Sequence, residues 1–255
     1  MEKSGNTLIE IDASAYGEVL PIETGDVETV VEELRRADRS RLLDRNWLET
    51  RLLPRLGLND EWSEHFPSCL RPFLGKGVKS WQYPCQFSGY LLYLANKNVT
   101  NYLEIGVRHG GTFIITCEYL NRFADLGRMV AIDPLESPVV NAYRALQPRV
   151  LYITELSHAA GARQIIQSCD WDHVLIDGDH SFEGCRTDFD LVKDRARRVA
   201  LHDIVSFTTP GVVSMWRTIR SVTPSRRLFE QTQQYSEVVQ KTHQPIMGIG
   251  VVEMA

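Results

Sequence analysis

Ionisable side chains gather at two neighbouring places in the second half of the chain. Asp177 and Asp179 come directly after an apolar run, and His202 and Asp203 follow the next such run. Apolar runs of this kind predict strands of a parallel sheet, and residues at the carboxyl ends of neighbouring strands lie close together. Three carboxylates beside an imidazole repel one another unless a cation or a shared proton lies between them. These residues therefore predict a reaction centre that holds a metal ion or moves a proton.

The same residues allow two interpretations. Carboxylate oxygens with one imidazole suit Mg²⁺ or Mn²⁺, and such a metal would hold an acceptor hydroxyl and lower its pKa while a nearby base removes the proton. The simpler alternative is structural. In it the two aspartates around Gly178 form a turn, Ser181 caps the next helix, and His202 pairs with Asp203.

A glycine-rich turn follows an earlier apolar run. The run contains Glu104 near its end, and the turn contains Gly106, Gly110 and Gly111, followed by Thr112. Glycines permit a tight turn and let a ligand approach the backbone where a helix begins. The spacing is not the G-x-G-x-x-G of a dinucleotide site. A carboxylate at Glu104 would repel a pyrophosphate, whereas it would attract the ammonium and sulfonium groups of S-adenosylmethionine (SAM).

The next two predicted strands also end in polar residues. Asp133 follows the second strand, where a carboxylate can accept hydrogen bonds from both ribose hydroxyls. Ser157 lies just past the third strand and would contact the adenine or cap the helix that follows. Each feature alone has a structural alternative, since a glycine loop can be a turn only and Asp133 before Pro134 can start a turn. Together, at the ends of successive strands, they indicate a SAM site.

The elements that position these residues alternate regularly from residue 101 onward. Apolar runs predict strands at 102–105, 129–132, 150–153, 173–176 and 199–201. Helical spacing predicts helices after the glycine turn and at about 138–147, 158–168, 183–194 and 211–222. Two last strands, at 227–229 and 246–252, are expected to form an antiparallel pair at the sheet edge with no helix between them. The pattern predicts an α/β fold with a doubly wound, mostly parallel, seven-stranded sheet.

Longer motifs in the same region resemble a known family. The segment Leu103–Gly111 together with Asp133 resembles the class I SAM-dependent methyltransferases. Within that class, further segments are similar to a group that includes macrocin-type sugar O-methyltransferases and cephalosporin hydroxylase-like proteins: WQYP at 81–84, IDGDHSFEG at 176–184, Asp188, and HDI at 202–204. The resemblance covers about residues 80–252. It implies a Rossmann-like methyltransferase sheet and methyl transfer from SAM to a hydroxyl of a sugar or secondary metabolite.

The resemblance also implies roles for single residues. Asp177 and Asp203 become metal ligands, Asp179 becomes the base, and Asp177 is placed beside the cofactor as well. His202 departs from the acidic residue found at this position in the sugar methyltransferases, so it is either a further ligand or the base itself. Two rival functions remain: a metal-dependent hydrolase or hydroxylase-like enzyme on the same fold, and a protein that binds SAM without turnover. The intact set of carboxylates argues against the second.

The N-terminal part has a different pattern. We expect a helical extension at residues 1–80 before a methyltransferase domain at 81–255. Asp26 is placed to cap a first helix, and a second helical stretch over residues 42–53 is expected to stop at Pro54. The apolar faces of these helices either cover the catalytic domain or form a subunit interface, and we expect a homo-oligomer through them.

Composition excludes several classes of partner. The 255 residues carry a net charge of -5 and no long basic run, which disfavours a nucleic-acid substrate. No apolar stretch approaches the length of a membrane span, and Met1–Gly5 lead into acidic and polar residues without a signal-peptide core. The five cysteines show no C-x-x-C spacing, as expected for free thiols in a reducing compartment. We therefore expect a cytoplasmic enzyme that acts on a small-molecule acceptor.

Overall fold

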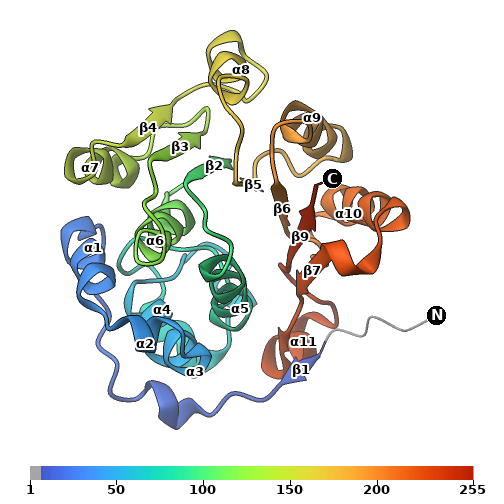
Figure 1. Cartoon of the computed structure of the whole chain (residues 1–255). Helices are drawn as coiled ribbons and strands as arrows, with labels where there is room; N and C mark the ends of the chain where they lie inside the picture. The colour runs from blue at the N-terminus through green and yellow to red at the C-terminus, as the bar shows by residue number, and fades with distance from the viewer. Residues whose placement is uncertain (1–6, 255) are drawn as a thin grey trace.

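A seven-stranded sheet forms the centre of the computed structural model, which describes residues 7–254 (Figure 1). Residues 1–6 and 255 lie outside the described residues. The ends of the two predicted ranges, 1–80 and 81–255, and the N-terminal run at Met1–Gly5 therefore fall outside the described part. The strand order is β4-β3-β2-β5-β6-β9-β7. Their bounds are β2 (Asn101–Ile105), β3 (Arg128–Ile132), β4 (Val150–Ile153), β5 (His173–Ile176), β6 (Arg198–His202), β7 (Leu228–Gln231) and β9 (Ile249–Glu253).

The directions of the strands confirm the predicted fold class. β4, β3, β2, β5 and β6 pair in parallel, whereas β9 pairs antiparallel with both β6 and β7. Each predicted strand lies within a few residues of an observed one, because a strand covered on both faces reads as a continuous apolar run. The antiparallel pair expected at the sheet edge is β7 with β9.

Helices cover both faces of the sheet (Figure 1). One hydrophobic core lies under α5 (Pro84–Ala95), α6 (Gly111–Leu120) and α7 (Pro138–Leu146). A second core lies under α8 (Ala160–Ile166), α9 (Phe182–Val192) and α10 (Pro210–Val222). The sheet is therefore doubly wound, and ligands are expected outside the carboxyl ends of its parallel strands.

One predicted feature of the C-terminal region was wrong. A helix, α11 (Ser236–Thr242), lies between β7 and β9, where none was expected. It buries only Ser236 and Val238, so its sequence carries too little apolar periodicity to be recognised. It follows β8 (Gln234–Tyr235), a short strand that pairs in parallel with β1 (Leu8–Ile9) near the N-terminus.

Helix α1 (Val27–Arg36) packs onto α6 and α7. Its N-cap is Asp26, whose side chain accepts a hydrogen bond from the Thr29 backbone N–H, as predicted. Its apolar residues are buried in the same core as α6 and α7: Val27, Val30, Val31 and Leu34. These side chains are thus covered within one chain. The homo-oligomer stays a prediction.

The second helical stretch is broken rather than continuous. It consists of α2 (Arg39–Leu42), α3 (Arg45–Trp47), a π-helical turn η2 (Leu48–Leu52) and α4 (Leu53–Arg55). The stretch ends at Arg55, one residue past Pro54, where it was expected to stop. A proline ring clashes with the carbonyl four residues earlier, and the wider π turn just before it relieves that clash.

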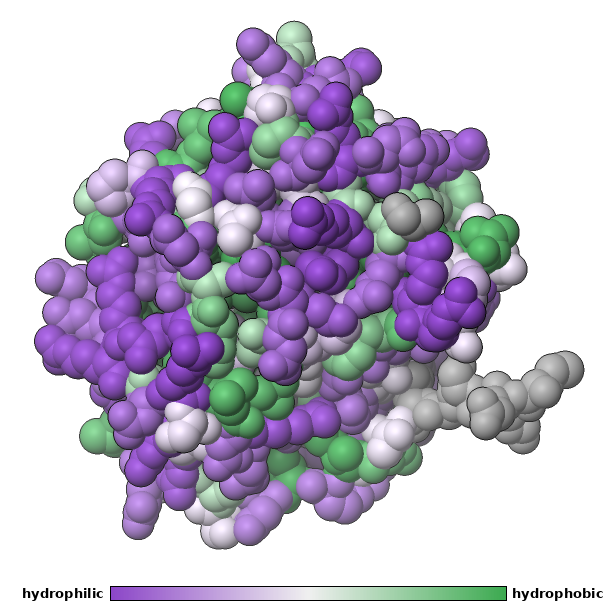
Figure 2. Space-filling model, viewed as in Figure 1, coloured by the Kyte–Doolittle hydropathy of each residue, from purple (hydrophilic) through white to green (hydrophobic). Residues whose placement is uncertain are grey.

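Short 3-10 turns complete the N-terminal part, at η1 (Ala13–Tyr16), η3 (Ser63–His65) and η4 (Ser68–Phe73), and a further one, η5 (Ser225–Arg227), precedes β7. On the face shown in Figure 2, hydrophilic residues predominate and hydrophobic ones form small separated groups. Within residues 7–254, every helix is too short or too polar to cross a membrane.

Candidate active site

A cavity of about 980 Å³ opens at the carboxyl ends of the parallel strands. Every residue predicted to bind the cofactor, to ligate a metal or to act as base lines it: Glu104, Gly106, Gly110, Gly111, Thr112, Asp133, Ser157, Asp177, Asp179, His202 and Asp203. Pockets for small ligands usually measure about 300–1,000 Å³, so this one has room for a cofactor and a second small molecule.

Glu104 lies near the end of β2 and is 1% exposed. It accepts a hydrogen bond from the hydroxyl of Tyr102, two residues earlier on the same face of the strand. Burial raises the pKa of the Glu104 carboxyl well above its usual range, while the hydrogen bond from Tyr102 opposes that shift. A cationic ligand beside this carboxylate would replace the hydration that burial removes.

Glycines of the loop after β2 fit against protein neighbours as well as lining the cavity. Gly106 has a φ of +84°, and a Cβ there would lie 2.2 Å from the backbone oxygen of Asp177. A Cβ on Gly111 would lie 2.4 Å from the backbone oxygen of Val78. The prediction from the sequence, that glycine lets a ligand approach, is therefore only part of the reason for glycine at these positions. These glycines also let β5 and the segment around Val78 pack closely against the loop.

Asp133 holds the glycine-rich loop in place. One of its carboxylate oxygens accepts hydrogen bonds from the backbone N–H groups of Val107 and Arg108, at 2.9 Å and 2.7 Å. The other accepts from the N–H of Leu135 at 2.9 Å, which is the turn that the structural alternative predicted. A carboxylate offers about four acceptor positions, so room is left for one further donor, such as a ribose hydroxyl.

Ser157 does not cap a helix. The N-cap of α8 is Ala159, without a side-chain cap, and the Ser157 hydroxyl instead donates to Asp188 on α9. Burial raises the pKa of Asp188 to about 6, although the hydrogen bond from Ser157 opposes the shift. Both residues line the cavity, so this pair forms one polar part of its wall.

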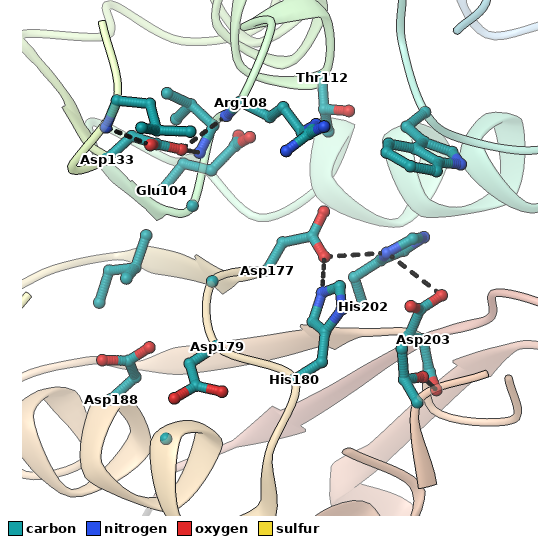
Figure 3. Close-up of a pocket in the computed structure, with 18 of the residues that line it drawn as sticks. Glu104, Arg108, Thr112, Asp133, Asp177, Asp179, His180, Asp188, His202 and Asp203 are labelled. Atoms are coloured by element: carbon teal, nitrogen blue, oxygen red, sulfur yellow. Dashed lines mark hydrogen bonds and ion pairs between the residues drawn. The ribbon is translucent and has the colours of Figure 1, made fainter. Parts of the chain in front are cut away.

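Two histidines converge on Asp177 (Figure 3). His202 Nδ1 lies 3.0 Å from Asp177 Oδ1, and His180 Nε2 lies 3.3 Å from the same oxygen. His202 Nδ1 is also 3.5 Å from Asp203 Oδ1, while His202 Nε2 is buried without a hydrogen-bond partner in the described part of the chain. The residues predicted from the ends of β5 and β6 thus meet, and His180 joins them.

Charges in this group stabilise one another. Burial disfavours the charged form of His202, but the carboxylates of Asp177 and Asp203 outweigh it and raise the pKa of His202 to about 9. Burial alone would raise the pKa of Asp177, yet the charge of His202 and the hydrogen bonds from both imidazoles hold it well below its usual range. The pKa of Asp203 is raised by burial, against the attraction of His202. At neutral pH an imidazolium lies between the carboxylates.

Asp179 lies apart from this group. Its side chain points toward α9 in Figure 3, where its carboxylate accepts a hydrogen bond from the Ser181 N–H at 2.8 Å. That contact holds the pKa of Asp179 below its usual range. Ser181 in turn caps α9 by accepting from the Gly184 N–H. The geometry gives Asp179 the structural role of the simpler alternative, and its predicted role as base has no support from it.

The side chains do not fit the predicted Mg²⁺ or Mn²⁺. Among residues 7–254, no group of three or more His, Cys, Asp or Glu is placed to hold a metal ion. One oxygen of Asp177 already contacts two imidazoles, and the positive charge expected from a cation is supplied by His202. The requirement for a metal stays a prediction from the sequence, and we derive no step through a metal ion.

Two sets of residues in the cavity wall were missed by the sequence interpretation. Leu135 and Leu156 follow β3 and β4, and they line the cavity although they are 59% and 52% exposed. Large apolar residues in polar loops directly after strands were the available signal. Asn59, Trp62 and His65 come from the N-terminal part, and no local sequence signal places them beside a strand end.

Comparison with known proteins supplies one family match. A family described as a methyltransferase domain matches residues 103–204, which include β2 to β6 and the residues at their carboxyl ends. No curated protein sequence matches the chain.

Several solved structures are similar at low sequence identity. The O-methyltransferase TomG from Streptomyces achromogenes, in complex with SAM, is 13% identical with a TM-score of 0.47, over 69% of this chain and 82% of that one. Cofactor-bound Rv0187 from MTB is 15% identical with a TM-score of 0.48, over 91% and 97%. The SAH-bound methyltransferase PaMTH1 from Podospora anserina is 13% identical with a TM-score of 0.44, over 94% and 99%.

Proposed function

We propose that this protein is a SAM-dependent methyltransferase that methylates a hydroxyl group of a small molecule. The observation that carries the proposal is the placement of Glu104, the glycine-rich loop and Asp133 around one cavity that also contains His202. A buried carboxylate near the end of β2 and a second one after β3 are separated by the loop, as the ammonium and ribose of SAM require. The match of residues 103–204 to a methyltransferase domain supports the same function.

Specific residues would hold the cofactor. Glu104 would attract its positive charge, the remaining acceptor position of Asp133 would take a ribose hydroxyl, and Leu135 and Leu156 would pack on the adenine. The bound cofactor supplies an electrophilic methyl group on sulfur. The protein's own part is to orient the acceptor oxygen in line with that methyl group and to remove the proton.

His202 is the residue best placed to remove the proton. Asp177 contacts its Nδ1, which fixes the ring and favours the form with the Nδ1 proton and a lone pair on Nε2. Among residues 7–254, Nε2 has no hydrogen-bond partner. A hydroxyl that reaches Nε2 would pass its proton to the imidazole as the oxygen forms its bond to carbon. Asp177 and Asp203 then stabilise the imidazolium, as the aspartate does in a Ser-His-Asp triad.

A small-molecule acceptor fits the charge of the cavity better than a nucleic acid. The net charge is -5, and the lysine and arginine of the described cavity wall, Lys79 and Arg108, are each paired with a carboxylate. Sugars and secondary metabolites are the acceptor classes that the sequence resemblance implies. Metal assistance and a base role for Asp179 stay predictions from the sequence, and a cytoplasmic location and a homo-oligomer remain proposals of the same kind.

Calorimetry and a coupled assay test the proposal together. SAM should bind to the purified protein, and S-adenosylhomocysteine (SAH) should be released when a suitable hydroxyl compound is added. SAM binding without turnover on any hydroxyl compound would favour the binding protein, and turnover of water or oxygen without SAM would favour the hydrolase or hydroxylase-like enzyme. Absence of SAM binding would contradict the proposal outright.

A further inference from the structure

The cavity has a second end, on the β6 and β9 side of the sheet order. Cofactor residues come from β2, β3 and β4, on one side of the sheet order, whereas His202 ends β6 and Met247 precedes β9 on the other side. Asn59, Trp62 and His65 from the N-terminal part also line the cavity, and Glu61 between them pairs with Arg108 and His109 of the glycine-rich loop. His65 lies close enough to Asp203 for the two to influence each other's charge.

Trp62 is held in an unfavourable backbone conformation at this end of the cavity. Its φ of +58° and ψ of +48° lie in the left-handed region, which is rare for a bulky residue and costs about 1–3 kcal/mol. Its side chain is 57% exposed, so little burial offsets the cost. Strain of this kind persists at ligand sites, where an exposed aromatic ring gains its partner when the ligand binds.

Trp62 and His65 form an aromatic wall of the cavity, and Phe207 packs beside His65. Trp62 stacks on His65, with centroids 5.6 Å apart and an interplanar angle of 18°. His65 in turn meets the edge of Phe207, from the loop after β6, at 6.2 Å. Burial lowers the pKa of His65, so this ring is neutral at pH 7 and does not attract anions. Such a wall accommodates a flat, uncharged ring.

Some of the polar groups at this end are already paired with each other, and one is not. The hydroxyls of Ser206 and Thr208 contact each other at 2.8 Å. Asn59 is fully buried, and its Oδ1 accepts from the Glu61 N–H, but no described residue accepts a hydrogen bond from its Nδ2. A buried amide without a partner costs about 1–3 kcal/mol, which a ligand oxygen would recover.

We propose that Asn59, Trp62 and His65 form the acceptor site, and that the acceptor is an uncharged phenolic compound with a further oxygen that accepts a hydrogen bond from Asn59 Nδ2. This inference rests on the proposed function. The phenolic ring of the acceptor lies against the aromatic wall, and the hydroxyl of the acceptor faces His202. The phenol oxygen bonds to the methyl carbon, the carbon–sulfur electron pair returns to sulfur and neutralises the sulfonium, and the phenol proton passes to His202 and then to water.

Three matched compounds test the class of acceptor: methyl 4-hydroxybenzoate, its acid 4-hydroxybenzoate, and the saturated ester methyl 4-hydroxycyclohexanecarboxylate. Calorimetry of each on the SAH-bound protein should show binding of the phenolic ester. The acid and the saturated ring should bind about ten-fold more weakly or worse. The cations of the described cavity wall, Lys79, Arg108 and His202, are already paired with carboxylates, and the saturated ring cannot stack. No binding of the phenolic ester, or tighter binding of either of the others, overturns the inference.

The variant Trp62→Gly separates recognition from stability. Glycine adopts a positive φ without strain, so the variant should melt at the same temperature as the unchanged protein or higher. Loss of the ring should weaken binding of the phenolic ester about ten-fold, with the SAM dissociation constant unchanged. A lower melting temperature with unchanged ester binding would show that Trp62 serves the fold, which overturns the inference.

Two further variants complete the test. Asn98 is exposed, lies outside the cavity wall and has a φ of +46°, so Asn98→Gly gives the same backbone relief and should leave ester binding unchanged. Asn59→Asp keeps the acceptor for the Glu61 N–H but removes the amide donor, and it should weaken ester binding about ten-fold. If the unchanged protein does not bind SAM, the proposed function is contradicted. If it binds SAM but not the phenolic ester, only the inference about the acceptor is overturned.

Discussion

His202 Nδ1 and Asp177 Oδ1 lie 3.0 Å apart, and this contact joins the ends of two neighbouring strands, β5 and β6. It fixes the orientation of the imidazole, and it also keeps the ring charged at neutral pH, because two carboxylates outweigh the effect of burial. A histidine that must accept a proton is thus held mainly in the form that cannot accept one. The pH dependence of the reaction should report this.

We expect kcat/KM for methyl transfer to rise with pH and to level off above a pKa of about 9, the value to which Asp177 and Asp203 raise the pKa of His202. The rate rises with pH because the neutral, basic form of His202 is the minor form below that pH. Asp177→Asn should move the rise to lower pH by about one unit or more, because burial then acts with less opposition. Initial rates of SAH release from about pH 6 to 10 measure both.

His202→Gln provides the control for that profile, since it keeps a polar side chain and removes the titrating group. The rise should disappear and the remaining rate should be lower by about 10²–10⁴-fold. A profile of the unchanged protein that is flat from neutral pH to pH 10 would contradict the role of His202 as base.

We expect methyl transfer to continue in excess chelator, because the imidazolium of His202 already compensates the carboxylates of Asp177 and Asp203. SAH release is measured on protein dialysed against EDTA, with and without added Mg²⁺ or Mn²⁺. Loss of activity on dialysis and recovery with either ion would restore the metal site that the sequence predicted. Asp177→Asn should then lose the ion as well as the activity.

Position along a strand could be predicted from the sequence, whereas side-chain partners could not. Glu104, Asp133 and His202 are found at strand ends because continuous apolar runs define buried parallel strands and the next polar residue marks the edge of the sheet. Which backbone N–H groups Asp133 accepts from depends on the path of the loop at 106–111, and no spacing rule gives that path.

The partners of Asp179 and of residues in the N-terminal part could not be predicted from the sequence either. Asp177 and Asp179 have equal chemistry in the sequence, but only Asp179 lies two residues before the N-cap Ser181, whose N–H turns it toward α9. Asn59, Trp62 and His65 reach the cavity because the chain from α4 crosses over the strand ends, which is a long-range contact without a local pattern. Local periodicity therefore predicts the sheet and its edge, and tertiary packing decides which side chains meet there.

Glu104→Gln should weaken SAM binding by about 10- to 100-fold, because a charge-assisted contact worth about 1.5–3 kcal/mol is lost while the shape of the side chain is kept. Its thermal stability should not fall, since burial already disfavours the charged carboxyl that the variant removes. Calorimetry with SAM and a melting curve give the two readouts. Equal SAM affinity in the variant and the unchanged protein would remove Glu104 from the cofactor site.

Asp133→Ala should differ from Glu104→Gln in losing stability as well as affinity. The variant leaves the N–H groups of Val107, Arg108 and Leu135 without their acceptor, at a cost of about 1–3 kcal/mol in the free energy of unfolding. Denaturant unfolding measures this cost, and calorimetry measures the loss of SAM binding. If stability falls and SAM still binds normally, Asp133 only shapes the loop.

Arg35 and Glu118 attach the N-terminal helix α1 to α6. Two guanidinium nitrogens of Arg35 contact the two oxygens of Glu118 at 2.8 Å and 3.0 Å, and Tyr143 also donates to that carboxylate. The side chain of Glu118 is 1% exposed, whereas that of Arg35 is 45% exposed. Removing the arginine leaves a buried carboxylate with one donor, but solvent at the exposed side reduces the penalty. We expect Arg35→Ala to lower the free energy of unfolding by about 1–2 kcal/mol.

Arg36→Ala is the matched control for this prediction, because Arg36 is the next residue of the same helix and its side chain is 77% exposed. It pairs with Glu32 one turn earlier, and such exposed pairs contribute about 0.3–0.5 kcal/mol, so the control should lose no more than this. Urea unfolding of both variants, with the size of the protein in solution measured alongside, compares them directly.

A loss of stability in Arg36→Ala as large as in Arg35→Ala would mean that helix propensity, and not the contact with Glu118, holds α1 in place. A change in size for Arg35→Ala alone would instead show that α1 takes part in assembly, because covering the core of one chain requires no second copy.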